Sequence, residues 1–190
     1  NSLSTNGFTT FSNNVNSISN LIYLNFNGNS NFNFDSLSSK ISFITVLSLS
    51  NCNLDLQKSI KSIFQNNFIK LSELDLSSNL CKSSFNIKED FPPKLSKLVV
   101  GNINWRSSSN LFSFLSYIFK KMNSILKLNL YSSKIDDLNE WKNFYSKLSK
   151  LTIDLSSIHS IGWDNNPIDS GFFTFVEKCV NLKTLSISSF

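Results

Sequence analysis

The sequence predicts an α/β solenoid: a right-handed arc with a parallel concave sheet and convex helices. Two observations lead to this fold class. An apolar motif recurs seven times along the 190 residues, and the segments between its copies show helical spacing. A short strand followed by a helix, repeated in this way, buries its apolar face only by stacking on its neighbours. Right-handed crossovers are the default for such parallel connections.

The motif has apolar residues at relative positions 0, 3 and 5, often at 10, and Asn or Cys at position 8. Steps between successive starts run from 23 to 33 residues, which leaves room for one strand and one helix in each unit. The starts are Leu21, Ile44, Leu71, Leu95, Ile125, Ile158 and Leu182. We therefore expect parallel strands near Leu24, Leu47, Leu74, Leu98, Leu128, Ile161 and Leu185.

Two units fit the motif less well. The unit that starts at Leu95 has Ile103 at position 8 instead of Asn. The segment 148–153 also matches the opening of the motif, so two registers remain open for the sixth strand, starting at Leu148 or at Ile158.

Each position of the motif has a local physical role. Residues 3 and 5 point inward from a strand and the polar residues between them point outward, as a period of two requires. An Asn at position 8 lies where the chain leaves the strand, where its amide can pair with backbone groups of its own unit and of the next. Cys52 replaces this Asn once, which favours a structural role over a reactive thiol.

The segments between strands carry apolar stripes that predict helices lying against the strand layer. Phe112, Phe114 and Tyr117 lie off their stripe; either neighbouring helices bury them or they form a second binding surface on the convex side. The pair Asp136–Asp137 is placed to cap the helix that follows it. The stripes are Leu56, Ile60, Ile63, Phe64 and Phe68; Leu111, Leu115, Phe119 and Met122; and Leu138, Trp141, Tyr145 and Leu148.

Composition points to a cytoplasmic protein. The three cysteines form no CxxC pair, and none of the 27 asparagines begins an N-x-Ser/Thr site. The net charge of +5 comes from scattered lysines, which is typical of a solvated surface and not of a nucleic-acid-binding stripe, and no apolar run has the length of a membrane helix. With no leader and an end inside a strand pattern, residues 1–190 are expected to be one repeat domain of about seven units from a longer protein.

The sequence offers no catalytic, metal or cofactor motif. His159 is the one histidine and follows a strand start, where a surface residue is ordinary. The pair Glu89–Asp90 lacks the spaced ligands of a calcium loop, and the glycines are isolated, without a phosphate loop. We expect no enzyme activity, no metal and no cofactor.

The repeats resemble the leucine-rich-repeat superfamily over nearly the whole chain, and their length resembles its ribonuclease-inhibitor-like class. The last two units also resemble the CARMIL family of actin capping-protein regulators, through residues 163–166, Ile168, Gly171-Phe172 and the strand 181–185. The gap between Ile168 and Gly171 is one residue shorter than in that family. This resemblance implies a scaffold within a multidomain cytosolic protein, whose capping-protein-binding segment lies outside this chain.

Outward strand positions predict a protein-binding concave face. It is expected to run from acidic at the second and third units to basic at the fourth and fifth, and to select a protein partner by charge and by its tyrosines. The alternative is a GTPase-activating or GTPase-binding module, for which Arg106 beside Trp105 is the one feature. The predicted partner-binding residues are Tyr23, Glu73, Asp75, Lys97, Lys127, Tyr131, Asp164 and Asn165, and Asn25, Val99 and Asn129 share the same face.

Overall fold

The computed structural model describes residues 3–18, 20–30, 33–66, 68–82, 84–87, 92–121, 124–135 and 137–188. Some residues discussed above lie outside this description: Met122, Glu89, Asp90, Asp136, and the side chains of Phe64 and Leu138.

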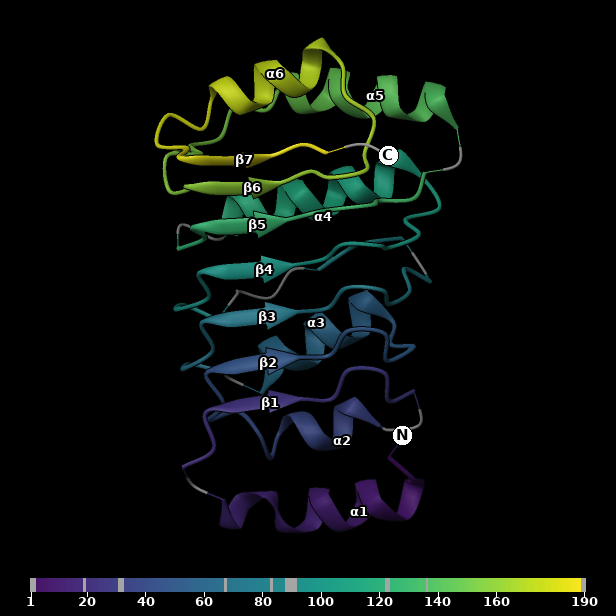
Figure 1. Cartoon of the computed structure of the whole chain (residues 1–190), viewed down its shortest axis with the longest axis vertical. Coiled ribbons are helices and arrows are strands. Elements are labelled where there is room, and N and C mark those ends of the chain that lie inside the picture. The colour runs from purple at the N-terminus through teal and green to yellow at the C-terminus, as the bar shows by residue number, and fades with distance from the viewer. Residues whose placement is uncertain are drawn as a thin grey trace.

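All seven predicted strands are present and form one parallel sheet in chain order (Figure 1). The residues predicted at the strand centres lie opposite one another, from Leu24 against Leu47 to Ile161 against Leu185. The fold class predicted from the motif is therefore confirmed. The strands are β1 (Tyr23–Asn25), β2 (Val46–Ser48), β3 (Glu73–Asp75), β4 (Lys97–Val99), β5 (Lys127–Asn129), β6 (Ser160–Gly162) and β7 (Thr184–Ser186).

The structure decides between the two registers of the sixth strand. β6 is centred on Ile161, as the start at Ile158 predicts, whereas Leu148 lies in a helix. The register that starts at Leu148 is wrong. Its apolar residues match the opening of the motif because a helical stripe and a strand opening share a spacing of three residues.

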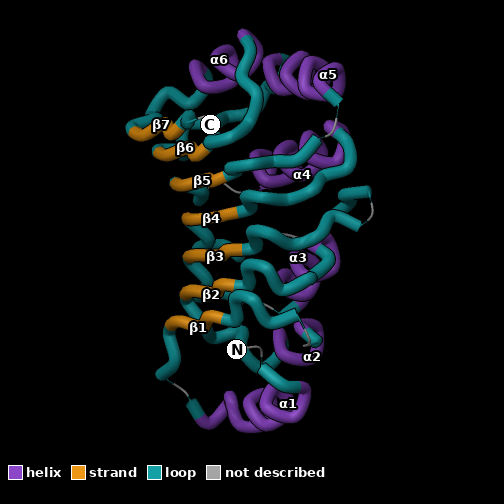
Figure 2. The backbone as a smooth tube through the Cα atoms, turned by 45° about the vertical axis from the view of Figure 1, so that its right-hand side comes forward, coloured by secondary structure: helices purple, strands orange, loops and turns teal. Residues whose placement is uncertain are grey.

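Helices cover the side of the sheet opposite the open strand face, with strands inside and helices outside the curve (Figure 2). The three predicted helices are confirmed, and Asp137 caps α5 by accepting a hydrogen bond from Asn139 N–H at 2.8 Å. In the described residues no helix could span a membrane. The helices are α1 (Thr5–Asn14), α2 (Phe34–Ser38), α3 (Leu56–Gln65), α4 (Ser108–Lys121), α5 (Leu138–Ser149) and α6 (Ser170–Glu177), with a 3-10 turn η1 (Val15–Ser17).

Helix α1 was not predicted and closes the N-terminal end of the stack (Figure 1). Phe8 and Val15 are buried, and the Phe8 and Phe11 rings meet the Phe26 ring edge-on at 6.4 and 5.2 Å. The helix therefore covers the core residue that follows β1, which would otherwise face solvent.

In the third unit, residues 84–87 have no regular secondary structure and pack in the outer layer. Asn86 exchanges backbone hydrogen bonds with the Gln57 side chain of α3, and the Phe85 ring packs against Phe114 and Tyr117 of α4. The segment thus fills the outer layer between α3 and α4. Phe85 thereby covers two of the off-stripe aromatics, Phe114 and Tyr117. Phe114 is fully buried, and Tyr117 and Phe112 are half-buried and pack against the core.

Candidate functional site

The asparagine at position 8 joins two units. Asn79 is 3% exposed; its Oδ1 accepts the N–H groups of Cys52 and Leu54 at 3.0 Å, and its Nδ2 donates to Leu49 O and Leu76 O. The bonds run to its own unit and to the preceding one. The expectation that they reach the next unit was wrong, because the turn of the preceding unit lies over the side chain.

The same kind of hydrogen bond recurs at position 8 of other units, and we call these side chains the asparagine ladder. Asn166 pairs with Ser133 N–H at 2.6 Å and Leu130 O at 2.6 Å, both in the preceding unit. Cys52 occupies the equivalent position, and its Sγ donates to Phe26 O at 3.1 Å, so its structural role is confirmed. All three cysteines are buried and free, and burial raises the pKa of Cys81 and of Cys179 to about 11.

The open strand face has three rows of side chains, which together we call the concave face. The first row starts the strands, the second ends them, and the third lies in the turns two residues later. The rows are Tyr23, Val46, Glu73, Lys97, Lys127, Ser160 and Thr184; Asn25, Ser48, Asp75, Val99, Asn129, Gly162 and Ser186; and Asn27, Ser50, Ser77, Gly101, Tyr131, Asp164 and Ser188.

Charges on the concave face differ from the expected gradient. Val46 and Ser48 of the second unit are uncharged, so acidic residues begin only at the third unit. Glu73 and Lys97 occupy equivalent positions of neighbouring strands and form an ion pair at 2.9 Å, with both side chains over 40% exposed. The charges of this pair offset each other. Lys127, by contrast, is exposed and has no partner within the described part of the chain.

The two aspartates of the face accept hydrogen bonds from nearby serines. Asp75 accepts from the backbone N–H of Ser77 at 2.9 Å and from its hydroxyl. Asp164 accepts from Ser188 N–H at 2.7 Å and from the hydroxyls of Ser188 and Ser186. These hydrogen bonds hold the pKa of Asp164 below its ordinary value, and those from Ser188 have the largest effect. The Asp164 carboxylate therefore stays charged at neutral pH, and both aspartates fix the local backbone through these hydrogen bonds.

Two glycines make room for side chains of the neighbouring unit. A Cβ added to Gly101 would lie 2.2 Å from the Tyr131 ring, and one added to Gly162 would lie 2.6 Å from Asn129 Oδ1. Tyr131 is therefore seated on the Gly101 backbone and is half-buried. Two hollows lie on the same face, one of about 180 Å³ over β1–β4 and one of about 210 Å³ over β4–β7.

The eight predicted residues do not form one compact cluster. Glu73, Asp75, Lys97 and Lys127 lie on the adjacent strands β3 to β5. Tyr131 and Asp164 lie in the neighbouring turn row, and Asn165 is exposed beside Asp164 with a positive φ of 57°. Tyr23 is 53% exposed at the N-terminal end, four strands from Lys127 or about 20 Å at the usual strand spacing.

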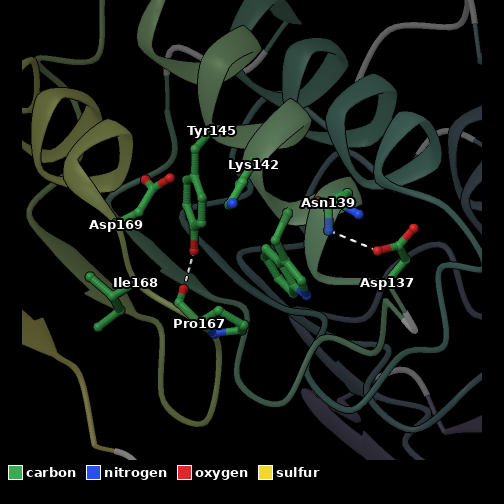
Figure 3. A pocket seen from close by; sticks show the side chains of 8 residues that line it. Asp137, Asn139, Lys142, Tyr145, Pro167, Ile168 and Asp169 are labelled. Atoms are coloured by element: carbon green, nitrogen blue, oxygen red, sulfur yellow. Dashed lines mark hydrogen bonds between the residues drawn. The ribbon is translucent and has the colours of Figure 1, made fainter.

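A separate pocket of about 670 Å³ lies outside the concave face, between the start of α5 and the turn before α6 (Figure 3). Trp141 and Tyr145 form its apolar wall, and the Tyr145 hydroxyl donates to Pro167 O. Asp137 and Asp169 lie at its rim, where each carboxylate already caps a helix. The sequence did not predict this pocket, because it depends on how two consecutive helices are placed.

The residues considered for catalysis or for GTPase activation are His159 and Arg106. His159 is half-buried, and its Nδ1 lies 2.7 Å from Ser157 O. Among the described residues no group of His, Cys, Asp and Glu is placed to hold a metal. Arg106 is exposed with a φ of 62°, and Trp105 beside it is fully buried.

The parallel sheet, the aligned register and the buried asparagine ladder define a leucine-rich-repeat solenoid. No protein-family model matches the chain, and no curated protein does. Among solved structures, the chain is similar to the leucine-rich repeat-containing protein LegL7 from Legionella pneumophila, with 19% identity and a TM-score of 0.46. That match covers 96% of this chain and 72% of the other.

Proposed function

We propose that this chain is a protein-interaction module that holds its partner on the concave face. The observation that carries the proposal is the continuity of the three rows across seven aligned parallel strands, with two shallow hollows between them. Residues far apart in sequence form one surface there, since neighbouring strands lie about 5 Å apart. A wide, shallow, open surface fits a protein better than a small molecule, which binds in enclosed cavities.

The centre of this surface lies on β4 to β6. Lys127 supplies an exposed cation, Tyr131 supplies an aromatic ring held by Gly101, and Asn129 supplies an amide seated over Gly162. Tyrosines and desolvated charges concentrate binding energy in protein interfaces. We therefore place the main anchor at Lys127 and Tyr131, facing an acidic group of the partner. Tyr23, Glu73, Asp75, Lys97, Asp164 and Asn165 are proposed to form the surrounding contact surface.

The narrower resemblances bear on the cellular context. The ribonuclease-inhibitor-like class is supported by the amphipathic helices α3, α4 and α5. In the CARMIL-like segment, Trp163 is buried in the core and Asn166 is a ladder residue. These two residues maintain the fold. We therefore base the proposal of an actin-regulating scaffold on the resemblance alone. The proposal of a cytoplasmic location is supported by the buried free thiols, which suit a reducing compartment.

The alternative class, a GTPase-activating or GTPase-binding module, rests on Arg106. Its side chain is exposed between Asn104 and α4, and its backbone N–H is fixed by Asn104 Oδ1 at 2.9 Å. An exposed arginine on an ordered loop has the form that a charge-stabilising finger requires. Changing Arg106→Ala should abolish any stimulation of GTP hydrolysis while leaving concave-face binding intact.

The test is capture of partners from a cytosolic extract by the immobilised chain, quantified by mass spectrometry. Lys127→Ala and Tyr131→Ala should each weaken binding by about 1–3 kcal/mol, so specific partners are lost. Lys120→Ala, on the exposed surface of α4, removes the same charge and should retain every partner. Retention of all partners by both concave variants, with folding verified by circular dichroism, would contradict the proposal.

A further inference from the structure

The pocket beside α5 lies where two consecutive units meet, outside the concave face (Figure 3). The first turns of α5, from the fifth unit, form one side, and the turn 167–169 of the sixth unit forms the other. Its volume of about 670 Å³ is in the range of small-molecule sites, which measure about 300–1,000 Å³. The proposed binding of a protein on the concave face leaves this pocket unused.

A hollow at this place also occurs inside the stack. Residues 167–169 occupy motif positions 9 to 11 of the sixth unit and correspond to Asn53, Leu54 and Asp55 of the second unit. Those three residues line a hollow of about 440 Å³ beside the start of α2. Among the described residues, the third unit contributes Lys82 to its lining, and the hollow stays open. A following unit therefore does not close a hollow of this kind.

The pocket at α5 differs from that hollow in having an aromatic inner wall. Trp141 and Tyr145 lie one helical turn apart, are 4% and 2% exposed, and stack with ring centroids 5.7 Å apart. The Tyr145 hydroxyl donates to Pro167 O and accepts from Trp163 Nε1 at 3.2 Å, so it is used within the fold and the ring is left for an occupant. Because packing fixes both rings, the inner wall is preformed and apolar.

Two carboxylates and one ammonium group belong to the lining of the pocket. Asp137 Oδ1 accepts from Asn139 N–H, and Asp169 Oδ1 accepts from two backbone N–H groups at the start of α6. Each Oδ2 has no partner among the described residues. Lys142 is the one cation of the described lining, so two negative charges and one positive charge leave a net charge of −1. This charge attracts a cation and repels an anion.

We propose that the pocket binds a small organic cation with a flat apolar body. The apolar body packs against Trp141 and Tyr145, and the charged group is attracted by the carboxylates of Asp137 and Asp169. An anion would meet both carboxylates, and a neutral ligand would leave them without a counter-charge. This binding does not depend on the concave face, so failure of either proposal leaves the other standing.

Tryptamine, tryptophol and indole-3-acetate test the proposal, because they share an indole ring and carry a positive, a neutral and a negative group at neutral pH. Each is titrated into the isotopically labelled chain while the amide resonances of Asn139 and Ile168 are followed. Tryptamine should shift these resonances and bind about fivefold more tightly than tryptophol, which is the upper range for an exposed charge pair. Indole-3-acetate should bind most weakly, and high salt should reduce the difference.

Matched variants separate the charge from the fold. Asp137→Asn and Asp169→Asn each keep a good helix cap and remove one charge, so each should weaken tryptamine binding about threefold and leave tryptophol binding unchanged. Lys142→Ala should strengthen tryptamine binding, because it removes the opposing cation. Asp154→Asn, at an exposed aspartate outside the lining, should change neither.

Three results would overturn the proposal. The first is that tryptamine at millimolar concentration leaves the Asn139 and Ile168 resonances unshifted. The second is that tryptamine and tryptophol bind equally, since the carboxylates would then play no part. The third is that the Asp137→Asn and Asp169→Asn double variant, with an unchanged circular dichroism spectrum, binds tryptamine as the original chain does.

Discussion

At the scale of single residues, the asparagines of the ladder pair with backbone groups of two neighbouring units. Asn79 satisfies backbone groups in two turns at once, two N–H groups through Oδ1 and carbonyls through Nδ2, in a site from which water is excluded. Leaving buried backbone groups unpaired costs free energy, and hydrophobic residues cannot replace these bonds.

Asn79→Ala should therefore lower the free energy of unfolding by about 1–3 kcal/mol, measured by urea denaturation. Asn143→Ala is the matched control, because Asn143 is exposed on α5 and alanine favours a helix. Equal stability of the two variants would show that the ladder contributes nothing.

Asp164 gives the chain a pH dependence of known sign. Serine hydrogen bonds lower its pKa in the folded state, so they stabilise the fold above the unfolded-state pKa of about 3.9. This stabilisation is lost as the pH falls through the folded pKa. The Ser188 amide resonance should therefore move only below about pH 4. In Asp164→Asn this titration should vanish, and its persistence there would assign the transition to another group.

At the scale of the element, one unit is shaped to receive a side chain of the next. Gly101→Ala should displace the Tyr131 ring from its position against the Gly101 backbone, because the new Cβ would lie 2.2 Å from the ring. We expect a loss of about 1 kcal/mol, at the low end for overpacking since Tyr131 is half-buried and can rotate outward. In a Tyr131→Ala background the same change should be nearly neutral. An equal loss in both backgrounds would place the clash elsewhere.

The elements that the sequence predicted are those with local periodicity. All strand centres and the helices α3, α4 and α5 follow from spacing within one unit. Helix α1 is rich in Asn, Ser and Thr and has no long stripe, so it depends on packing of Phe8 and Phe11 against Phe26. Residues 84–87 likewise depend on the neighbouring helix α4 for the Phe85 contacts.

At the scale of the whole molecule, the rows of the concave face could be predicted but their chemistry only in part. The ion pair of Glu73 and Lys97 could have been predicted from the sequence, because both residues occupy the same motif position in consecutive units. The contact of the Tyr131 ring with Gly101 and the pocket beside Trp141 could not be predicted, since both depend on the distance between side chains of different units.

The central claim is that the partner lies across the concave face, and site-specific photo-cross-linking tests it most directly. A photoreactive phenylalanine placed at Tyr23 or Tyr131 should cross-link the captured partner. The same group at Lys120 or Asn143, exposed on the convex helices α4 and α5, should not. Cross-links that form only from the convex positions would contradict the claim.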